Sequence, residues 1–171
     1  KFLWSPFLEI FKTKKFFVVL TQIVTGVGFG LVALSLQLPS FFAVCIALLA
    51  IIAFSGATHD IATDGVYMSE LNKQEQAKYI GWQGAFYNIA KIVASGGLVW
   101  LAGWLLTKFN EGGGAEAQQE ATVKAWMTVM LILGGVMLLL GFYHARILPS
   151  GGKQEAAQHY TASEILKSLL E

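Results

Sequence analysis

The sequence predicts an all-α fold, a polytopic bundle of membrane helices, from its composition and from one long uncharged segment. Of the 171 residues, 55% are hydrophobic and only 13% are charged, whereas an average soluble domain is about 45–50% apolar and about 25% charged. Residues 16–58 contain no Asp, Glu, Lys or Arg, which is a stretch of 43 residues. This composition excludes a disordered chain and disfavours a water-soluble globule.

Four segments are long and apolar enough to cross a bilayer, whose hydrocarbon core takes about 20 helical residues. We expect helices at residues 16–37, 41–67, 79–107 and 125–145. The turn signal Leu38-Pro39-Ser40 separates the first two, and the second is expected to continue helically through the polar string HDIATDGVYMSEL. The third segment contains a single charged residue, Lys91.

The distribution of basic residues predicts one orientation for these helices. Basic residues precede the first helix, lie between the second and third, and follow the fourth: Lys12, Lys14, Lys15, Lys73, Lys78, Arg146, Lys153 and Lys167. Lysine and arginine are enriched in cytoplasmic loops, so these three segments are expected in the cytoplasm. In the opposite loop, glutamates outnumber lysines and Gly112, Gly113 and Gly114 favour a flexible connector.

The two ends of the sequence predict that it is a segment of a longer protein. It begins at Lys1 without an initiator Met or a signal peptide. Residues 147–171 are expected to form a cytoplasmic linker. In this linker Thr161 and Glu164 have the spacing of a capping box ahead of an amphipathic helix.

Asp60 and Asp64 are the first candidate functional residues. They lie four residues apart at the end of the second apolar segment, so both carboxylates project from one helix face. A carboxylate at membrane depth costs about 2.5–3.5 kcal/mol on insertion scales, so something must compensate it. We consider two interpretations, a proton-titrating or solute-binding pair facing water, and a pair that holds basic residues of neighbouring helices.

His59 raises the alternative of a membrane-embedded enzyme or metal site built with Asp60 and Asp64. Consecutive helical residues point about 100° apart, so His59 and Asp60 are expected to diverge. A metal site is therefore disfavoured, and we expect neither a metal nor another cofactor. The plainer interpretation is a histidine hydrogen-bonded to a neighbouring helix. The enzyme alternative also lacks the further paired acids and basic residue that a lipid phosphotransferase needs, so we expect no enzyme.

Lys91 is the most informative single residue, because a lysine near the centre of an apolar helix costs about 3 kcal/mol. One turn before it lie Tyr87 and Asn88, and two turns before it lies Gln83. The functional hypothesis is that Lys91 binds an anionic or hydroxyl-rich solute, or changes how readily the Asp60 carboxyl ionises. The side chains of Gln83, Tyr87 and Asn88 would then line the cavity. The alternative is that Lys91 only forms an internal salt bridge and that the neighbouring polar side chains satisfy one another.

Small residues recur at helical spacing and predict close helix approach rather than chemistry. The three motifs are Gly26-x-x-x-Gly30, Ala53-x-x-x-Ala57 and Ser95-Gly96-Gly97. In membrane helices such motifs allow two backbones to pack closely.

Three strings together resemble one family. They are KFLWSP at the start of the chain, HDIATDGVYMSEL, and KYIGWQGAFYNIAKIVASGGLVWLAGW. In combination they resemble the corresponding stretch of AmpG-type muropeptide permeases of the major facilitator superfamily, over nearly all of residues 1–146. The resemblance implies that the four spans are helices three to six of a twelve-helix transporter, part of its N-terminal six-helix half.

The same resemblance implies proton-coupled import of a muropeptide by alternating access across the bacterial inner membrane. Residues 1–15 would then be the cytoplasmic loop after helix two, with Glu9, Lys12, Lys14 and Lys15 in a gating role. Asp60 and Asp64 would take the places of the family's two aspartates. The implied partners are the solute, protons, the lipid bilayer and the remainder of the transporter. The near-zero net charge gives no basic face for nucleic acid.

The sequence departs from the family pattern at two places that bear on the substrate. Glu9 stands where the family has Asp, and lysines replace its arginine-rich run, which removes bidentate contacts. The basic residue of the family's fifth helix lies six positions before Ser95, whereas this chain has Lys91 four positions before it. A different glycoside or small metabolite therefore remains an alternative substrate.

Overall fold

The computed structural model describes residues 12–110 and 113–151, and all regular secondary structure in these ranges is helical. The elements are α2 (Lys14–Ser35), α3 (Phe41–Glu70), α4 (Lys73–Ile92), the π-helix η1 (Val93–Gly97), α5 (Leu98–Phe109) and α6 (Ala115–Ile147). Because α4, η1 and α5 run on without a break, the chain forms four long helical rods, each long and apolar enough to cross a membrane. The predicted helical bundle is confirmed, and the architecture is that of a multi-pass membrane protein.

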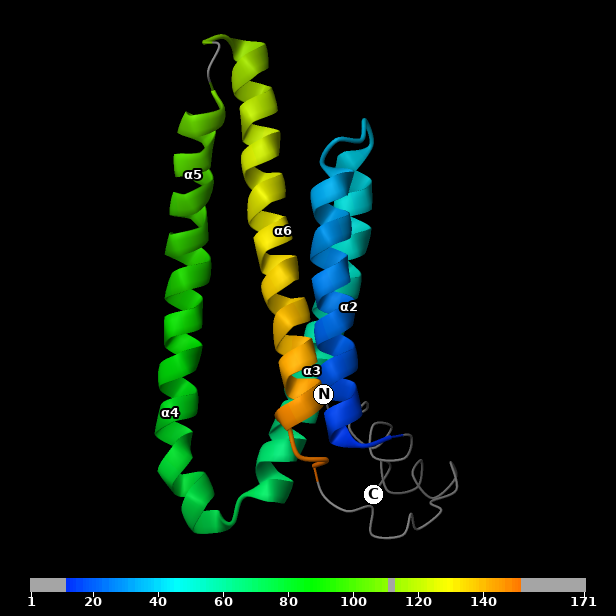
Figure 1. Ribbon diagram of the computed structural model, residues 1–171, viewed down its shortest axis with the longest axis vertical. Coiled ribbons are helices and arrows are strands. Elements are labelled where there is room, and N and C mark those ends of the chain that lie inside the picture. The colour runs from blue at the N-terminus through cyan, green and yellow to red at the C-terminus, as the bar shows by residue number, and fades with distance from the viewer. Residues whose placement is uncertain (1–11, 111–112, 152–171) are drawn as a thin grey trace, which may run out of the picture.

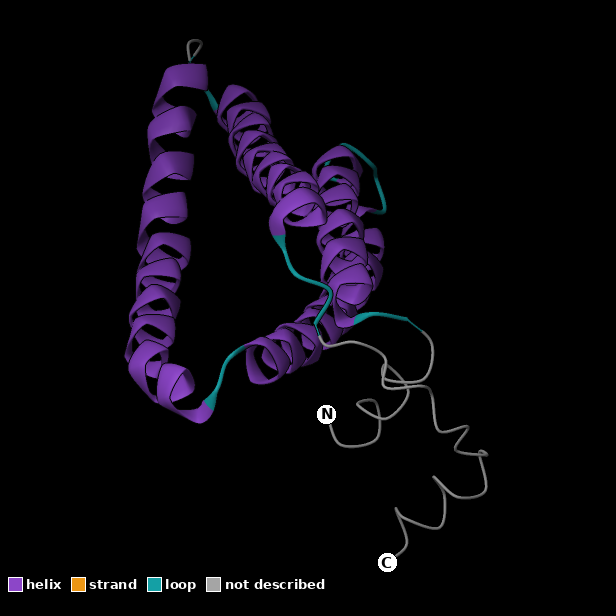
Figure 2. Cartoon of the chain, turned by 60° about the horizontal axis from the view of Figure 1, so that its bottom comes forward, coloured by secondary structure: helices purple, strands orange, loops and turns teal. Residues whose placement is uncertain are grey.

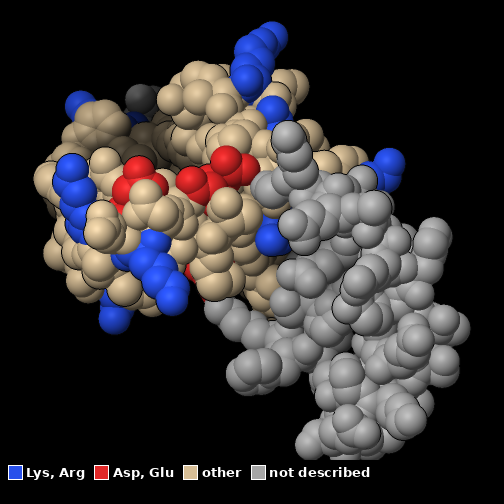
Figure 3. Space-filling view, turned by 90° about the horizontal axis from the view of Figure 1, so that it is seen from below, with Lys and Arg blue, Asp and Glu red and all other residues tan. Residues whose placement is uncertain are grey.

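The rods alternate in direction, which places the basic segments together. The start of α2, the α3–α4 connection and the end of α6 lie at one end of the molecule, which we call the basic end (Figure 1). The α2–α3 turn and the α5–α6 loop lie at the other. Viewed from the basic end, Lys and Arg side chains stand at the rim, with acidic side chains between them (Figure 3).

The helices form two groups of unequal packing. α2 packs against both α3 and α6, and α5 packs against the outer half of α6. α4, in contrast, contains no buried residue, and its main packing partner is its own continuation η1. In both views α4 diverges from the group formed by α2, α3 and α6, and their separation increases toward the basic end (Figures 1 and 2).

Two glycines set the crossing of α2 and α6. A Cβ atom added to Gly134 would lie 2.7 Å from the carbonyl oxygen of Gly26, and one added to Gly26 would lie 2.9 Å from that of Gly134. Neither distance is compatible with a side chain, so the two backbones are in direct contact. Gly30 belongs to the predicted motif but has open space at its Cβ position.

The second predicted small-residue motif is wrong. Ala53 and Ala57 are exposed in the described part of the chain, and α3 instead buries Ser55, Thr58 and Ala62 against its neighbours. The buried face of α3 is therefore partly polar, and Ala53 and Ala57 lie outside it.

Two small apolar clusters complete the packing. Between α5 and α6 the buried members are Ala102, Leu105, Ala125 and Val129. Near the basic end, Val18 of α2 packs with Ala62 and Val66 of α3, and Leu148 closes this cluster from beyond α6.

α3 continues through the polar string to Glu70, as predicted, whereas α4 begins at Lys73, six residues before its predicted start at residue 79. Asn72 explains the early restart, because its side chain accepts hydrogen bonds from the amides of Gln74 and Glu75 while the Glu75 carboxylate accepts from the Asn72 amide. This reciprocal capping box satisfies backbone donors that would otherwise be unpaired.

We expect replacement of Asn72 by alanine to destabilise the start of α4 by about 1 kcal/mol, the usual cost of losing an N-cap side chain. Amide hydrogen exchange at Gln74 and Glu75 would measure it as faster exchange. Asn72→Asp keeps the acceptor oxygen and is the matched control. Equal exchange in the alanine and aspartate variants would contradict the capping role.

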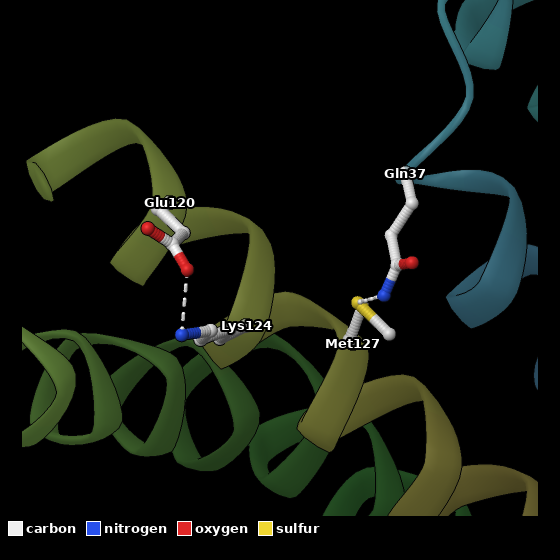
Figure 4. Close-up of polar contacts among 4 residues, drawn as sticks. All are labelled: Gln37, Glu120, Lys124 and Met127. Carbon is white, nitrogen blue, oxygen red and sulfur yellow. Dashed lines mark hydrogen bonds and ion pairs between the residues drawn. The ribbon is translucent and has the colours of Figure 1, made fainter. Parts of the chain in front are cut away.

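The outer end of α6 also extends beyond its apolar segment. The helix begins at Ala115, ten residues before the predicted span, and its exposed first turns contain a salt bridge of 2.7 Å between Glu120 and Lys124 (Figure 4). At the same end the Gln37 amide donates a hydrogen bond of 3.2 Å to the sulfur of Met127, which ties the α2–α3 turn to α6 (Figure 4). Polar side chains thus continue the helix outside the hydrocarbon region.

Candidate functional site

The structure places Asp60 and Asp64 on one face of α3, as the four-residue spacing predicts. α3 is uninterrupted from Phe41 to Glu70, so the two carboxylates are one turn apart. Asp60 is exposed and Asp64 is half-buried. Both lie in the second half of α3, which runs toward the basic end.

Lys91, Gln83, Tyr87 and Asn88 all lie on α4 and are exposed. Gln83, Tyr87 and Lys91 follow one another at four-residue spacing, so they form one stripe along the helix, which we call the polar stripe of α4. Asn88 lies beside it and donates a hydrogen bond of 2.9 Å to the Gly84 carbonyl of its own helix. The polar stripe therefore belongs to the helix that leans away from the others.

The π-helix η1 begins two residues after Lys91, and it was not predicted. In η1 the Ser95 hydroxyl donates a hydrogen bond of 2.7 Å to the Lys91 carbonyl. The prediction that Ser95-Gly96-Gly97 allows close helix approach is wrong, since all three residues are exposed and a Cβ at Gly96 would meet nothing within 4 Å. Single-turn π segments are frequent at functional sites of helices.

The polar stripe of α4 does not pack against the face of α3 that carries Asp60 and Asp64. α3 and α4 are consecutive and antiparallel, but away from their connection α4 does not pack against α3 (Figure 1). The convergence of Lys91 and Asp60 that the sequence allowed is therefore not present here.

A buried polar seam connects α2 and α3. The Thr25 hydroxyl donates a hydrogen bond of 3.1 Å to the Ser55 hydroxyl, which donates one of 3.0 Å to the Thr21 carbonyl. All three side chains are buried. Hydrogen bonds of this kind between membrane helices stabilise association by about 0.6 kcal/mol on average.

Next to this seam, a glutamine of α2 lies against a histidine of α6. The Gln22 side chain, only 3% exposed, lies with its nitrogen 2.9 Å and its oxygen 3.0 Å from Nδ1 of His144 on α6. His59 of α3 is half-buried. Its Nε2 atom is buried and has no hydrogen-bond partner among the described residues.

A third set of contacts closes the basic end. The backbone amide of Gly151 donates a hydrogen bond of 3.0 Å to the Glu70 carboxylate, and the Lys15 amide donates one of 3.4 Å to the Ser150 carbonyl. The aliphatic part of Lys14 packs against both Gly65 and Gly151. We call this set the basic-end clasp; it joins α2, α3 and the segment after α6.

The predicted gating loop is only partly described. Lys14 and Lys15 are half-buried and take part in the basic-end clasp, whereas Lys12 is exposed. Glu9 and the predicted amphipathic helix after Thr161 lie outside the described residues. In the ranges that the structure describes, no three His, Cys, Asp or Glu side chains gather closely enough to hold a metal ion.

Two contacts were not predicted from the sequence. They are the hydrogen bonds between Gln22 and His144 and between Gly151 and Glu70. A signal for Gln22 was present, because Thr21 and Gln22 are adjacent polar residues within an apolar helix. His144 lies at the end of the fourth apolar segment, where no pattern marks it as functional. Partners 81 and 122 residues apart, as in these hydrogen bonds, have no local signature.

The fold and these contacts define the class of the protein as a multi-pass helical membrane protein with polar side chains between its helices. Comparisons with protein-family models, with curated proteins and with solved structures find no match to this chain.

Proposed function

We propose that this chain is a segment of a secondary transporter of the major facilitator type, which imports a muropeptide or a related sugar-containing solute together with protons across the bacterial inner membrane. Asp60, Asp64 and Lys91 are the residues proposed to take part in proton coupling. Gln83, Tyr87 and Asn88 are proposed to line the solute path.

The observation that supports this proposal best is the polar stripe of α4. A lysine facing hydrocarbon is costly, and intramembrane ionisable residues generally face a hydrated cavity or another helix. The polar groups of Gln83 and Tyr87 would also face hydrocarbon at a cost, because both residues lie on the same side of α4 as Lys91 and all three are exposed. A water-filled solute path beside α4 explains why these residues share one face.

The unequal packing of the rods fits alternating access. The group of α2, α3 and α6 is held by glycine contact, buried hydrogen bonds and the basic-end clasp. In contrast, α4 is held near its start by a hydrogen bond from Tyr67 of α3 to the Gln76 carbonyl, and it has no buried residue along its length. Transporters change access by moving rigid groups of helices against one another around a site near the middle of the membrane. The firmly packed group and the loosely packed α4 provide such a division.

The test is proton uptake driven by a muropeptide in proteoliposomes that contain the complete transporter. We expect Lys91→Leu to lower this uptake at least about tenfold, because a hydrogen bond to a charged group contributes about 1.5–3 kcal/mol. Lys78→Leu is the matched control, since Lys78 is an exposed lysine on the same helix near the basic end.

Unchanged uptake in the Lys91→Leu variant would refute the role of the polar stripe. A wild-type protein that takes up protons with a neutral glycoside and not with a muropeptide would instead support the alternative substrate.

A further inference from the structure

The rod that runs from α4 through η1 to α5 contains one turn in which three causes of helix bending coincide. The Leu98 amide donates its hydrogen bond to the Val93 carbonyl, five residues back rather than four. The Ser95 hydroxyl donates one of 2.7 Å to the Lys91 carbonyl, and Gly96-Gly97 follows it. Helices bend at π-helical turns, at glycine and serine pairs, and where a side chain competes for a backbone carbonyl. η1 is therefore the point at which this rod bends most easily.

η1 also separates a packed part of the rod from an unpacked one. After η1, α5 is held in place because Ala102 and Leu105 are buried against α6. Before η1, α4 contains no buried residue, and a Cβ atom at Gly96 would meet nothing within 4 Å. α4 and the group of α2, α3 and α6 separate toward the basic end (Figures 1 and 2). A bend at η1 thus moves α4 and leaves α5 where it is.

The end of α4 farthest from η1 is attached to α3 by hydrogen bonds. The Tyr67 hydroxyl donates one of 2.6 Å to the Gln76 carbonyl, and the Gln76 side-chain nitrogen donates one of 2.7 Å to the Leu71 carbonyl. We call these two hydrogen bonds the α4 latch. In the same last turn of α3, the Glu70 carboxylate accepts a hydrogen bond from the Gly151 amide. The α4 latch therefore connects α4, through the end of α3, to the basic-end clasp.

We propose that α4 is a lever that pivots at η1 and is held at its basic end by the α4 latch. When the latch opens, α4 swings against the group of α2, α3 and α6 while α5 stays packed on α6. The connection formed by Leu71 and Asn72 spans at most about 7 Å, so the swing is confined to that scale. The swing displaces the polar stripe of α4. It is a property of the helices and does not depend on whether the chain carries a solute.

The test is the distance between two spin labels, measured by double electron–electron resonance on the complete protein in phospholipid nanodiscs. The labels are attached through Lys73→Cys, at the residue of α4 farthest from η1, and Arg146→Cys, at the exposed end of α6. The native Cys45 is replaced by serine, which keeps a hydroxyl for its contact of 3.2 Å with Ser35. A reference pair at Leu34 and Arg146 lies wholly within the packed group.

Tyr67→Phe tests the latch, because the ring stays and only the latching hydroxyl is lost. We expect this variant to increase the population of a second distance between residues 73 and 146 about fivefold, as for the loss of one hydrogen bond. Tyr79→Phe is the matched control, since Tyr79 is an exposed tyrosine of α4 that takes no part in the α4 latch. The reference distance is expected to stay unchanged in both variants.

The double variant Gly96→Ala, Gly97→Ala tests the pivot. Alanine favours a regular helix at both positions, so we expect the second population to fall at least about tenfold, in the wild type and in Tyr67→Phe. Gly81→Ala, Gly84→Ala is the matched control, since both glycines have open space at their Cβ positions on α4, away from η1.

Three results would overturn the proposal: an unchanged distance distribution in Tyr67→Phe, an equal effect of the two double glycine variants, or a change in the reference distance. The first would show that the hydroxyl of Tyr67 does not hold α4, and the second that the rod does not pivot at η1. The third would show that the whole bundle loosens. The glycine variants in the wild-type background decide the pivot even if Tyr67→Phe fails to fold.

Discussion

Replacing Gly134 by alanine is expected to destabilise the protein by about 1–3 kcal/mol, the range found when atoms are added to a packed interior. The new methyl group would lie 2.7 Å from the Gly26 carbonyl oxygen and 3.4 Å from the Gly30 nitrogen. These neighbours are backbone atoms that cannot rotate away. The variant must therefore separate α2 from α6, which also weakens the contact between Gln22 and His144.

Gly135→Ala is the matched control, because Gly135 is the next residue of the same helix and its Cβ position meets nothing within 4 Å. Both substitutions bring the same gain in helix propensity, so the difference between them isolates the clash. Reversible unfolding in mixed detergent micelles measures the two free energies. Equal stabilities would show that the helices do not cross at Gly26 and Gly134.

Replacing Gly151 by alanine is expected to open the basic-end clasp. Gly151 has a φ of +79°, a region that costs a non-glycine residue about 1–2 kcal/mol. An added Cβ would also lie 2.8 Å from Cβ of Lys14 and 3.1 Å from a methyl group of Val66. The strain and the clash both act against the position in which the Gly151 amide reaches Glu70, so we expect that hydrogen bond to be lost.

Gly113→Ala is the control for an alanine at a positive φ elsewhere in the chain, since Gly113 has a φ of +53° and no atom within 4 Å of its Cβ position. Hydrogen exchange of the Gly151 amide is expected to accelerate in Gly151→Ala and to stay unchanged in Gly113→Ala. Slow exchange at residue 151 in both variants would show that the clasp tolerates a side chain there.

The positions of the long helices were predictable because a membrane helix has a local signature. Each needs about 20 consecutive apolar residues, and that requirement is visible in the sequence without any partner. The helix ends were less predictable. α4 and α6 begin before their apolar segments, since capping at Asn72 and the polar turns before Lys124 satisfy backbone groups where hydropathy gives no signal.

The candidate site was predictable only in part. Asp60, Asp64 and Lys91 stand out because an ionisable side chain in an apolar helix is costly wherever it points. Which of them face each other was not predictable, and the structure leaves Lys91 on a helix that leans away from α3. The same holds for small residues: of the two glycines in Gly26-x-x-x-Gly30, only Gly26 has no room for a side chain, and its contact Gly134 belonged to no predicted motif.

The sequence by itself determined that this protein is helical, how many long helical rods it has, and which end gathers the basic residues, because length, hydropathy and charge act along the chain. Only the tertiary structure decided that Gln22 meets His144, that Thr25 meets Ser55, and that Gly151 reaches Glu70. These contacts depend on the rotation and crossing of whole helices. Rotation and crossing are set by the summed packing of many side chains, which no short stretch of sequence specifies.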